Sequence, residues 1–100
     1  MTSKQRAYLR GLAMNIEPIV QVGKSAVSPE LVQSVQEVFH TRELIKISVL
    51  KNCFEEPRDI AEVIAERTHA EVVQVIGKKI VLYKPFKENP QIVLPEAKKK

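Results

Sequence analysis

The stretch PIVQVGKSAVSPEL, which runs from Pro18 to Leu31, holds a strand, a turn and the start of a helix in direct succession. Its opening residues are mostly apolar and are typical of a short strand, which Gly23 ends. Ser28 and Pro29 follow as a serine N-cap and a proline in the first helical turn. The stretch therefore predicts a strand–turn–helix unit whose turn carries a glycine, a lysine and a hydroxyl.

Two further helices flank this unit in the sequence. Residues 3–14 have apolar side chains at helical spacing, and Ser3 is the expected N-cap. The helix that Pro29 opens is expected to continue to about Thr41, and Pro57 is expected to open the third helix. The first helix is basic and contains no acid; its cations are Lys4, Arg6 and Arg10.

The predicted strands are residues 18–22, 44–50, 71–76 and 79–84. Gly77-Lys78 joins the last two as a two-residue turn of type II′, which requires glycine first. Residues 44–50 are apolar on both faces and predict a strand covered on both sides. Residues 92–94 are expected to add a short edge pairing. The predicted fold is α/β (α+β), a single domain over 1–97 with a mixed four-stranded sheet, two or three packed helices and right-handed crossovers, followed by a basic tail at 98–100.

Charge is distributed unevenly along the 100 residues. Residues 52–71 contain two basic and six acidic residues, a net charge of −4, so the rest of the chain carries +8. Such asymmetry would orient the protein toward a polyanion. No run approaches the roughly 18 apolar residues of a membrane span, and no secretory signal is visible. The single cysteine, Cys53, cannot form an internal disulfide, and we expect a soluble cytoplasmic protein.

The turn after the first strand permits three interpretations. A nucleotide-binding P-loop needs a glycine five residues before Gly23, where this chain has Pro18, and no later strand ends in a plausible Mg²⁺ ligand. The nucleotide-hydrolase interpretation is therefore disfavoured. A short G-x-x-G-type clamp on a nucleic-acid backbone, as in KH domains, would use Lys24 and Ser25 as polar middle positions. The third interpretation is a plain strand-to-helix turn with an exposed lysine.

The predicted hairpin carries a second group of cations. The stretch IGKKIVLYKP, from Ile76 to Pro85, puts Lys78 and Lys79 at the tip and Lys84 at the far end. These lysines fit contacts to a polyanion, and they fit equally well solubilising residues that protect a sheet edge.

Four pieces of the chain together resemble the CRM domain, a family that includes chloroplast splicing factors and stand-alone bacterial proteins of the YhbY type. They are KQRAYLRGLA (4–13), PIVQVGKSAVSPELV (18–32), ELIKISV (43–49) and VQVIGKKIVLYKP (73–85), and their order and spacing carry the resemblance. It implies a compact fold similar to the C-terminal domain of translation initiation factor 3. It also implies RNA binding and, for stand-alone bacterial members, a part in maturation of the large ribosomal subunit.

By this resemblance the family's G-x-x-G loop falls on Gly23, Lys24, Ser25 and Ala26, so alanine stands where a second glycine is usual. If that position needs a positive φ, Ala26 is strained by roughly 1 kcal/mol or more; if it needs only a small side chain, alanine suffices. The resemblance places the rest of the RNA-binding surface on Lys4, Arg6, Arg10, Lys78, Lys79 and Lys84. Recognition of phosphates and shape in structured, ribosomal RNA is the expected mechanism.

The remaining residues give weaker evidence of function. No nucleophile–base constellation is visible, so we expect a non-catalytic protein without a cofactor or a small-molecule substrate. His40 and His69 have no acid or cysteine at ligand spacing, and no metal site is expected. Tyr8, Tyr83 and Phe86 could stack on bases, although Tyr83 fits core packing as well. The main rival hypothesis is a protein-interaction module that docks on a ribosomal protein or assembly factor through the acidic third helix.

Overall fold

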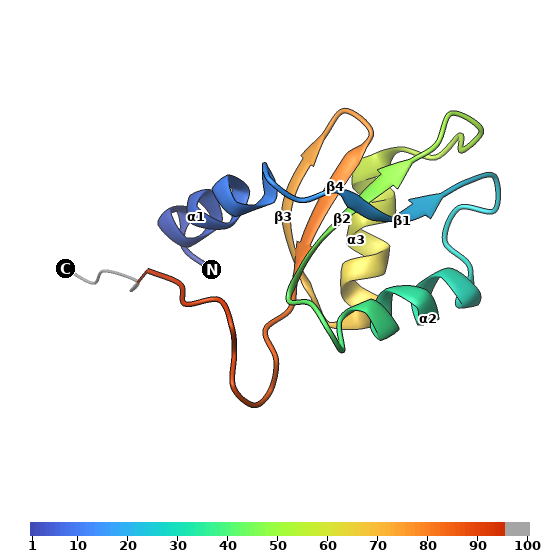
Figure 1. Ribbon diagram of the computed structural model, residues 1–100. Helices are drawn as coiled ribbons and strands as arrows, with labels where there is room; N and C mark the ends of the chain where they lie inside the picture. Colours follow the sequence, from blue (N-terminus) through green and yellow to red (C-terminus); the bar gives the residue numbers. More distant parts are fainter. Residues whose placement is uncertain (96–100) are drawn as a thin grey trace.

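The computed structural model describes residues 1–95, so the predicted tail at 98–100 and the end of the predicted domain lie outside the described residues. Helices and strands follow one another in the predicted order (Figure 1). None of the helices in this described part is long and apolar enough to cross a membrane. The elements are α1 (Ser3–Ala13), β1 (Pro18–Val22), α2 (Pro29–Val38), β2 (Leu44–Val49), α3 (Pro57–Thr68), β3 (Glu71–Ile76) and β4 (Lys79–Tyr83).

The strands form one sheet in the order β1-β2-β4-β3, and the predicted mixed four-stranded sheet is confirmed. β1 and β2 are parallel, whereas β4 is antiparallel to both of its neighbours. Val22 pairs with Val49, and Ser48 pairs with Lys79 at the start of β4. The connections after β1 and β2 therefore leave the sheet at the same end of the strands as the β3–β4 turn. We call this end the loop end of the sheet.

The sheet separates two hydrophobic cores, because side chains along each strand alternate between its faces. On β4, Ile80 and Leu82 enter the larger core beneath α2 and α3, whereas Val81 and Tyr83 enter the smaller core beneath α1. Figure 1 shows α1 apart from α2 and α3, across the sheet. The alternate residues of β2 from Ile45 to Val49 are buried in the larger core, but on the other face only Leu44 joins the smaller core. The prediction that this strand is covered on both sides is therefore wrong: the hydrophobic core covers β2 completely on only one of its faces.

The helix ends differ from expectation in two places. The N-cap of α1 is Thr2 and not Ser3, because Thr2 forms a capping box in which its hydroxyl accepts from the Gln5 N–H and the Gln5 side chain accepts from the Thr2 N–H. The α2 helix ends at Val38, before the predicted end at Thr41. The predicted Ser28 cap is confirmed: its hydroxyl accepts a hydrogen bond of 3.1 Å from the Leu31 N–H.

The predicted edge pairing of residues 92–94 is wrong, because a buried carboxylate holds this segment in place of a strand ladder. Glu43 is only 4% exposed and accepts backbone hydrogen bonds from Phe86 (2.7 Å), Gln91 (2.9 Å) and Ile92 (2.7 Å). Ile92 and Leu94 then pack against the smaller core. The Glu43 side chain, directly before β2, therefore anchors the segment after β4 at residues 86, 91 and 92.

Tyr83 lies in the smaller core and is 5% exposed, which leaves its ring face unavailable to a base. Burial raises the pKa of the Tyr83 phenol above its ordinary value of 10.0, and the negative charge of Glu43 raises it further. A raised phenol pKa means that the folded state keeps its proton longer than the unfolded chain does. This contribution to stability is therefore lost as the pH rises above about 10.

Candidate nucleic-acid interface

The turn between β1 and α2 is a closed four-residue turn at the loop end. The Ala26 N–H donates to the Gly23 carbonyl at 2.9 Å, and the side chains of Lys24 and Ser25 between them are exposed. The turn lies against the connection that follows β2, because a Cβ built on Gly23 would come within 3.5 Å of Asn52 Oδ1. Gly23 is therefore where two connections approach each other closely.

Ala26 has a φ of +53°, so the position does require the left-handed conformation. Of the two alternatives, a position that needs a positive φ and a position that needs only a small side chain, the first holds. Alanine is strained here, because its Cβ crowds the backbone in the left-handed region. The Ala26 methyl packs against the larger core, which compensates for part of the strain. Position 26 thus has a left-handed backbone conformation, which glycine would adopt without strain.

Stability should follow the order glycine, alanine, valine at position 26. We expect Ala26→Gly to raise the free energy of unfolding by up to about 1 kcal/mol, since relief of strain exceeds the lost methyl packing and the added chain entropy. Ala26→Val should lower it by about 1 kcal/mol or more, because β-branched residues tolerate positive φ poorly. Urea denaturation measures both, and a glycine variant clearly less stable than the parent would contradict the assignment of strain.

The β3–β4 turn brings further cations to the loop end. Gly77 has a φ of +57°, as the first residue of a type II′ turn requires. The Lys78 carbonyl accepts from the Val49 N–H at 2.8 Å, which holds the hairpin tip against the end of β2. Lys78 and Lys79 are both exposed there.

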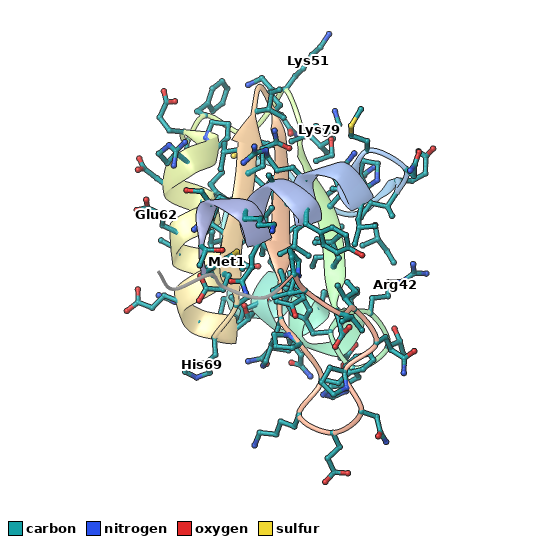
Figure 2. All side chains as sticks on the ribbon, turned by 90° about the vertical axis from the view of Figure 1, so that its left-hand side faces the viewer. Met1, Arg42, Lys51, Glu62, His69 and Lys79 are labelled. Carbon is teal, nitrogen blue, oxygen red and sulfur yellow. The ribbon has the colours of Figure 1, made fainter. Side chains whose placement is uncertain are left out.

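Lys51, which no sequence motif identifies, directly follows Leu50 after β2 and is exposed at the loop end. Its neighbour Leu50 donates its N–H to the Val22 carbonyl at 2.8 Å, so the ends of β1 and β2 are tied together. Figure 2 shows Lys51 and Lys79 on one side of α1 and Arg42 on the other. We name the group at the loop end the lysine end; it consists of Lys24, Lys51, Lys78 and Lys79.

The cations of α1 have different environments. The Arg6 guanidinium donates to the Val72 carbonyl and so fastens α1 to β3. Arg10 is four residues further along and lies on the same flank of the helix, exposed. The other flank faces the C-terminal segment, because Gln5 donates to the Pro95 carbonyl at 3.0 Å. Arg10 is therefore exposed on the flank of α1 opposite Gln5, and Lys4 is exposed at the start of the helix.

Lys84 is separated from the other predicted contacts. It follows β4 at the end opposite Lys79, about 17 Å along the strand at roughly 3.3 Å per residue. Its N–H donates to the Glu43 carbonyl at 2.8 Å, beside the start of β2. The structure therefore gathers Lys24, Lys78 and Lys79 at the loop end and leaves Lys84 at the opposite end of the sheet, so these four lysines do not form one surface.

Three of the six acidic residues in the segment 52–71 lie on α3, on the face of the sheet opposite α1. Asp59, Glu62 and Glu66 are exposed on α3, which packs beneath β3 and β4 (Figure 2). Glu55 and Glu56 are nearer to the loop end, since they lead from the β2 connection into α3. Glu71, the remaining acid of the segment, is exposed at the start of β3, where it pairs with Tyr83 at the end of the sheet away from the hairpin turn. The acids of α3 therefore lie on the face opposite α1, whereas Glu55 and Glu56 lie near the loop end and Glu71 lies near the other end.

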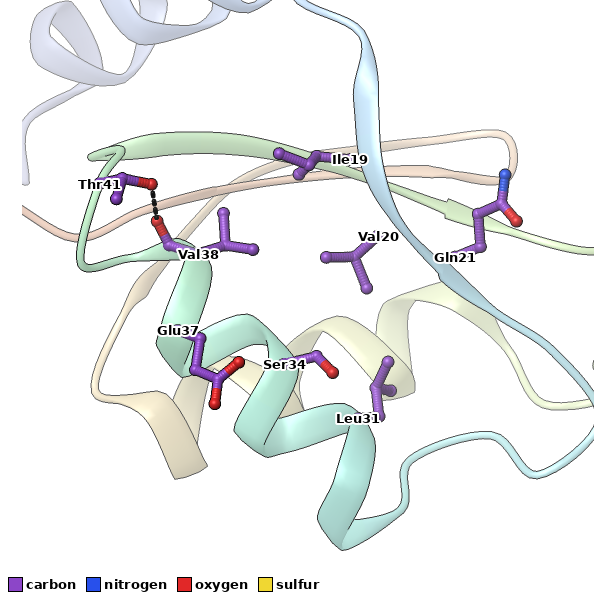
Figure 3. Close-up of a pocket in the computed structure, with 8 residues that line it drawn as sticks. All are labelled: Ile19, Val20, Gln21, Leu31, Ser34, Glu37, Val38 and Thr41. Atoms are coloured by element: carbon purple, nitrogen blue, oxygen red, sulfur yellow. Dashed lines mark hydrogen bonds between the residues drawn. The ribbon is translucent and has the colours of Figure 1, made fainter.

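A groove between β1 and α2 is a separate feature, with a volume of about 510 Å³. Figure 3 shows Val20, Leu31 and Val38 turned toward it, with the Glu37 carboxylate at its rim. It contains none of the lysines, and Glu37 would repel a phosphate. Among residues 1–95, no cluster of three or more histidine, cysteine or acidic side chains is arranged to hold a metal ion.

Comparison with known proteins gives consistent matches. The model of the CRS1/YhbY (CRM) domain matches residues 1–84. The "Probable RNA-binding protein YqeI" of Bacillus subtilis is 46% identical over 95 residues, which cover 95% of this chain and 99% of that protein. An "RNA-binding protein" of Haemophilus influenzae is 33% identical, with 95% of each chain covered. The solution structure of SAV1595 from Staphylococcus aureus, described as a candidate RNA-binding protein, has 45% identity and a TM-score of 0.81, covering 95% of this chain and 99% of its own.

Proposed function

This chain belongs to the CRS1/YhbY (CRM) domain family, and from that membership we propose that it binds RNA through the lysine end. One observation carries the proposal: lysines from three separate connections lie together at the loop end of the sheet. Backbone hydrogen bonds from Leu50 to Val22 and from Val49 to Lys78 fix these connections relative to one another. The names of the relatives, which describe RNA-binding proteins, also support the proposal.

The proposed mechanism is directed at the RNA backbone. A phosphate approaches the Gly23–Ala26 turn, where Lys24 pairs with it and Ser25 offers a hydroxyl donor. The neighbouring phosphates contact Lys51, Lys78 and Lys79. Arg10 provides a further phosphate contact on α1. The carboxylates of α3 lie on the face of the sheet opposite α1, so the charge distribution favours approach of the polyanion to the lysine end and the α1 face over approach to α3.

We propose further that the RNA is ribosomal and that the protein acts in the cytoplasm during assembly of the large ribosomal subunit. The basis is the resemblance to stand-alone bacterial proteins of the YhbY type. Recognition would rest mainly on phosphates and RNA shape, because the site offers several exposed cations and few groups that can read base edges.

Binding of a labelled fragment of large-subunit ribosomal RNA, followed by fluorescence anisotropy at several salt concentrations, tests the proposal. If each of the four lysines neutralises one phosphate, the logarithm of affinity should fall with the logarithm of salt at a slope of about −3. An affinity that does not change with salt would contradict the electrostatic mechanism.

Sedimentation of cell lysate tests the assembly role, because the protein should travel with precursors of the large subunit. The rival hypothesis, docking through the acidic face of α3, makes the opposite prediction in reconstitution. In that case the protein would bind intact particles but neither naked ribosomal RNA nor particles depleted of their proteins.

A further inference from the structure

Phe54 is the most exposed large apolar side chain at the loop end, with 89% of its surface accessible to solvent. It follows Lys51 by three residues in the connection between β2 and α3. Two other exposed apolar side chains accompany it, Leu50 in the same connection and Ile76 beside the hairpin tip. The lysine end is thus interspersed with apolar groups, a combination typical of nucleic-acid sites.

The fold accounts for the outward direction of this side chain. The Cys53 N–H donates to the Leu50 carbonyl at 3.1 Å, which closes a turn and places Cys53 in the larger core at 4% exposure. The next residue, Phe54, is directed into solvent. The connection must also cross from the end of β2 to the start of α3, which packs beneath β3 and β4, so it passes the hairpin tip at Lys78.

We propose, on the premise that the lysine end binds RNA, that Phe54 is a stacking platform for an unpaired base. Lys51 and Lys78 hold the phosphates on either side of that nucleotide. Charge complementarity favours a nucleotide over an apolar protein partner, because a protein surface covering Phe54 would also have to cover these lysines. Glu55 and Glu56 exclude phosphates from the α3 side, so the RNA strand passes on the lysine side of the ring.

Two RNAs of equal length and charge separate this stacking role from general phosphate binding. One probe is a stem with an unpaired loop, and the other is a fully paired duplex. Phe54→Ala and Phe54→Leu should each weaken binding of the looped RNA by about 10-fold, the effect of losing one stacked base. Affinity for the duplex and the salt slope should not change, and Phe54→Tyr should bind the looped RNA like the parent.

Because the chain contains no tryptophan, Phe54→Trp provides a single fluorescent reporter. The looped RNA should quench its emission strongly and the duplex should not. Phe86→Trp, at the opposite end of the sheet, is the matched control and should be quenched by neither RNA.

The outcomes distinguish the two proposals. If the parent protein binds neither RNA, the proposed function fails, and the stacking role fails with it. If the parent binds the looped RNA and Phe54→Leu binds it equally well, RNA binding stands and the stacking role is overturned. Loss of binding to intact ribosomal particles by Phe54→Ala, with unchanged affinity for the looped RNA, would also overturn it and assign Phe54 to a protein contact.

Discussion

Glu43→Ala is expected to lower the free energy of unfolding by about 3 kcal/mol, because three backbone N–H groups lose a charged acceptor. The three hydrogen bonds are 2.7–2.9 Å long, and the carboxylate that accepts them is 4% exposed. Each such bond contributes about 1.5–3 kcal/mol when one partner is charged, but water can reach part of the segment once it loosens. The expected loss of stability is therefore smaller than the sum of the three hydrogen-bond contributions.

Urea denaturation measures this effect, with Glu37→Ala as the matched control for loss of an exposed carboxylate. Glu37 lies on the solvent side of α2, so its replacement should change stability by less than about 0.5 kcal/mol. Glu43→Gln should fall between the two, since its amide keeps one accepting oxygen but turns an NH₂ group toward the other donors. If Glu43→Ala and Glu37→Ala are equally stable, the carboxylate does not hold the C-terminal segment.

Replacing all four lysines of the lysine end by glutamine should weaken RNA binding by about 100- to 1,000-fold at physiological salt. Each neutralised phosphate contact releases about one counterion, so the salt slope should also become shallower by about 3. Melting temperature should change little, because all four side chains are exposed. Anisotropy with the same ribosomal RNA fragment and thermal unfolding give both quantities.

The matched control removes four cations from the opposite end of the molecule: Arg42, Arg67, Lys84 and Lys87. Both variants reduce the formal net charge of +4 to zero, so any effect of total charge is the same in the two. The control should lose no more than about 10-fold in affinity, the share expected from long-range attraction. Equal losses in the two variants would mean that net charge, and not the lysine end, determines binding.

The order of elements could be predicted from sequence because its signals are local. Ser28 and Pro29 mark the start of α2, and Gly77 marks the hairpin, without reference to any other part of the chain. The N-cap of α1 was assigned one residue late, since Ser3 and Thr2 carry equivalent hydroxyls and only the Gln5 side chain distinguishes them. The segment at 92–94 has the composition of a strand, but a carboxylate 49 residues away holds Ile92 instead.

The site could be predicted only in part, because it depends on which strand ends lie together. Lys24 and Lys78 were identified from short motifs. Lys51 and Phe54 have no motif, and they enter the site only because β1 and β2 are parallel with β4 beside them. The right-handed crossovers expected from the sequence already indicate parallel strands, whose C-terminal ends lie at the same end of a sheet. Lys84 belongs to the same hairpin motif as Lys78, but it follows β4 and therefore lies at the end of the sheet opposite the loop end.

An NMR titration of the ¹⁵N-labelled protein with the looped RNA tests most directly whether the loop end of the sheet is the RNA-binding surface. Backbone amide shifts should change for residues 23–27, 50–54 and 76–79, and to a smaller extent near Arg10. Amides around Lys84 and along α3 should keep their positions. Shift changes centred on α3 or on residues 84–88, with the three loop-end segments unaffected, would contradict the assignment of the RNA-binding surface.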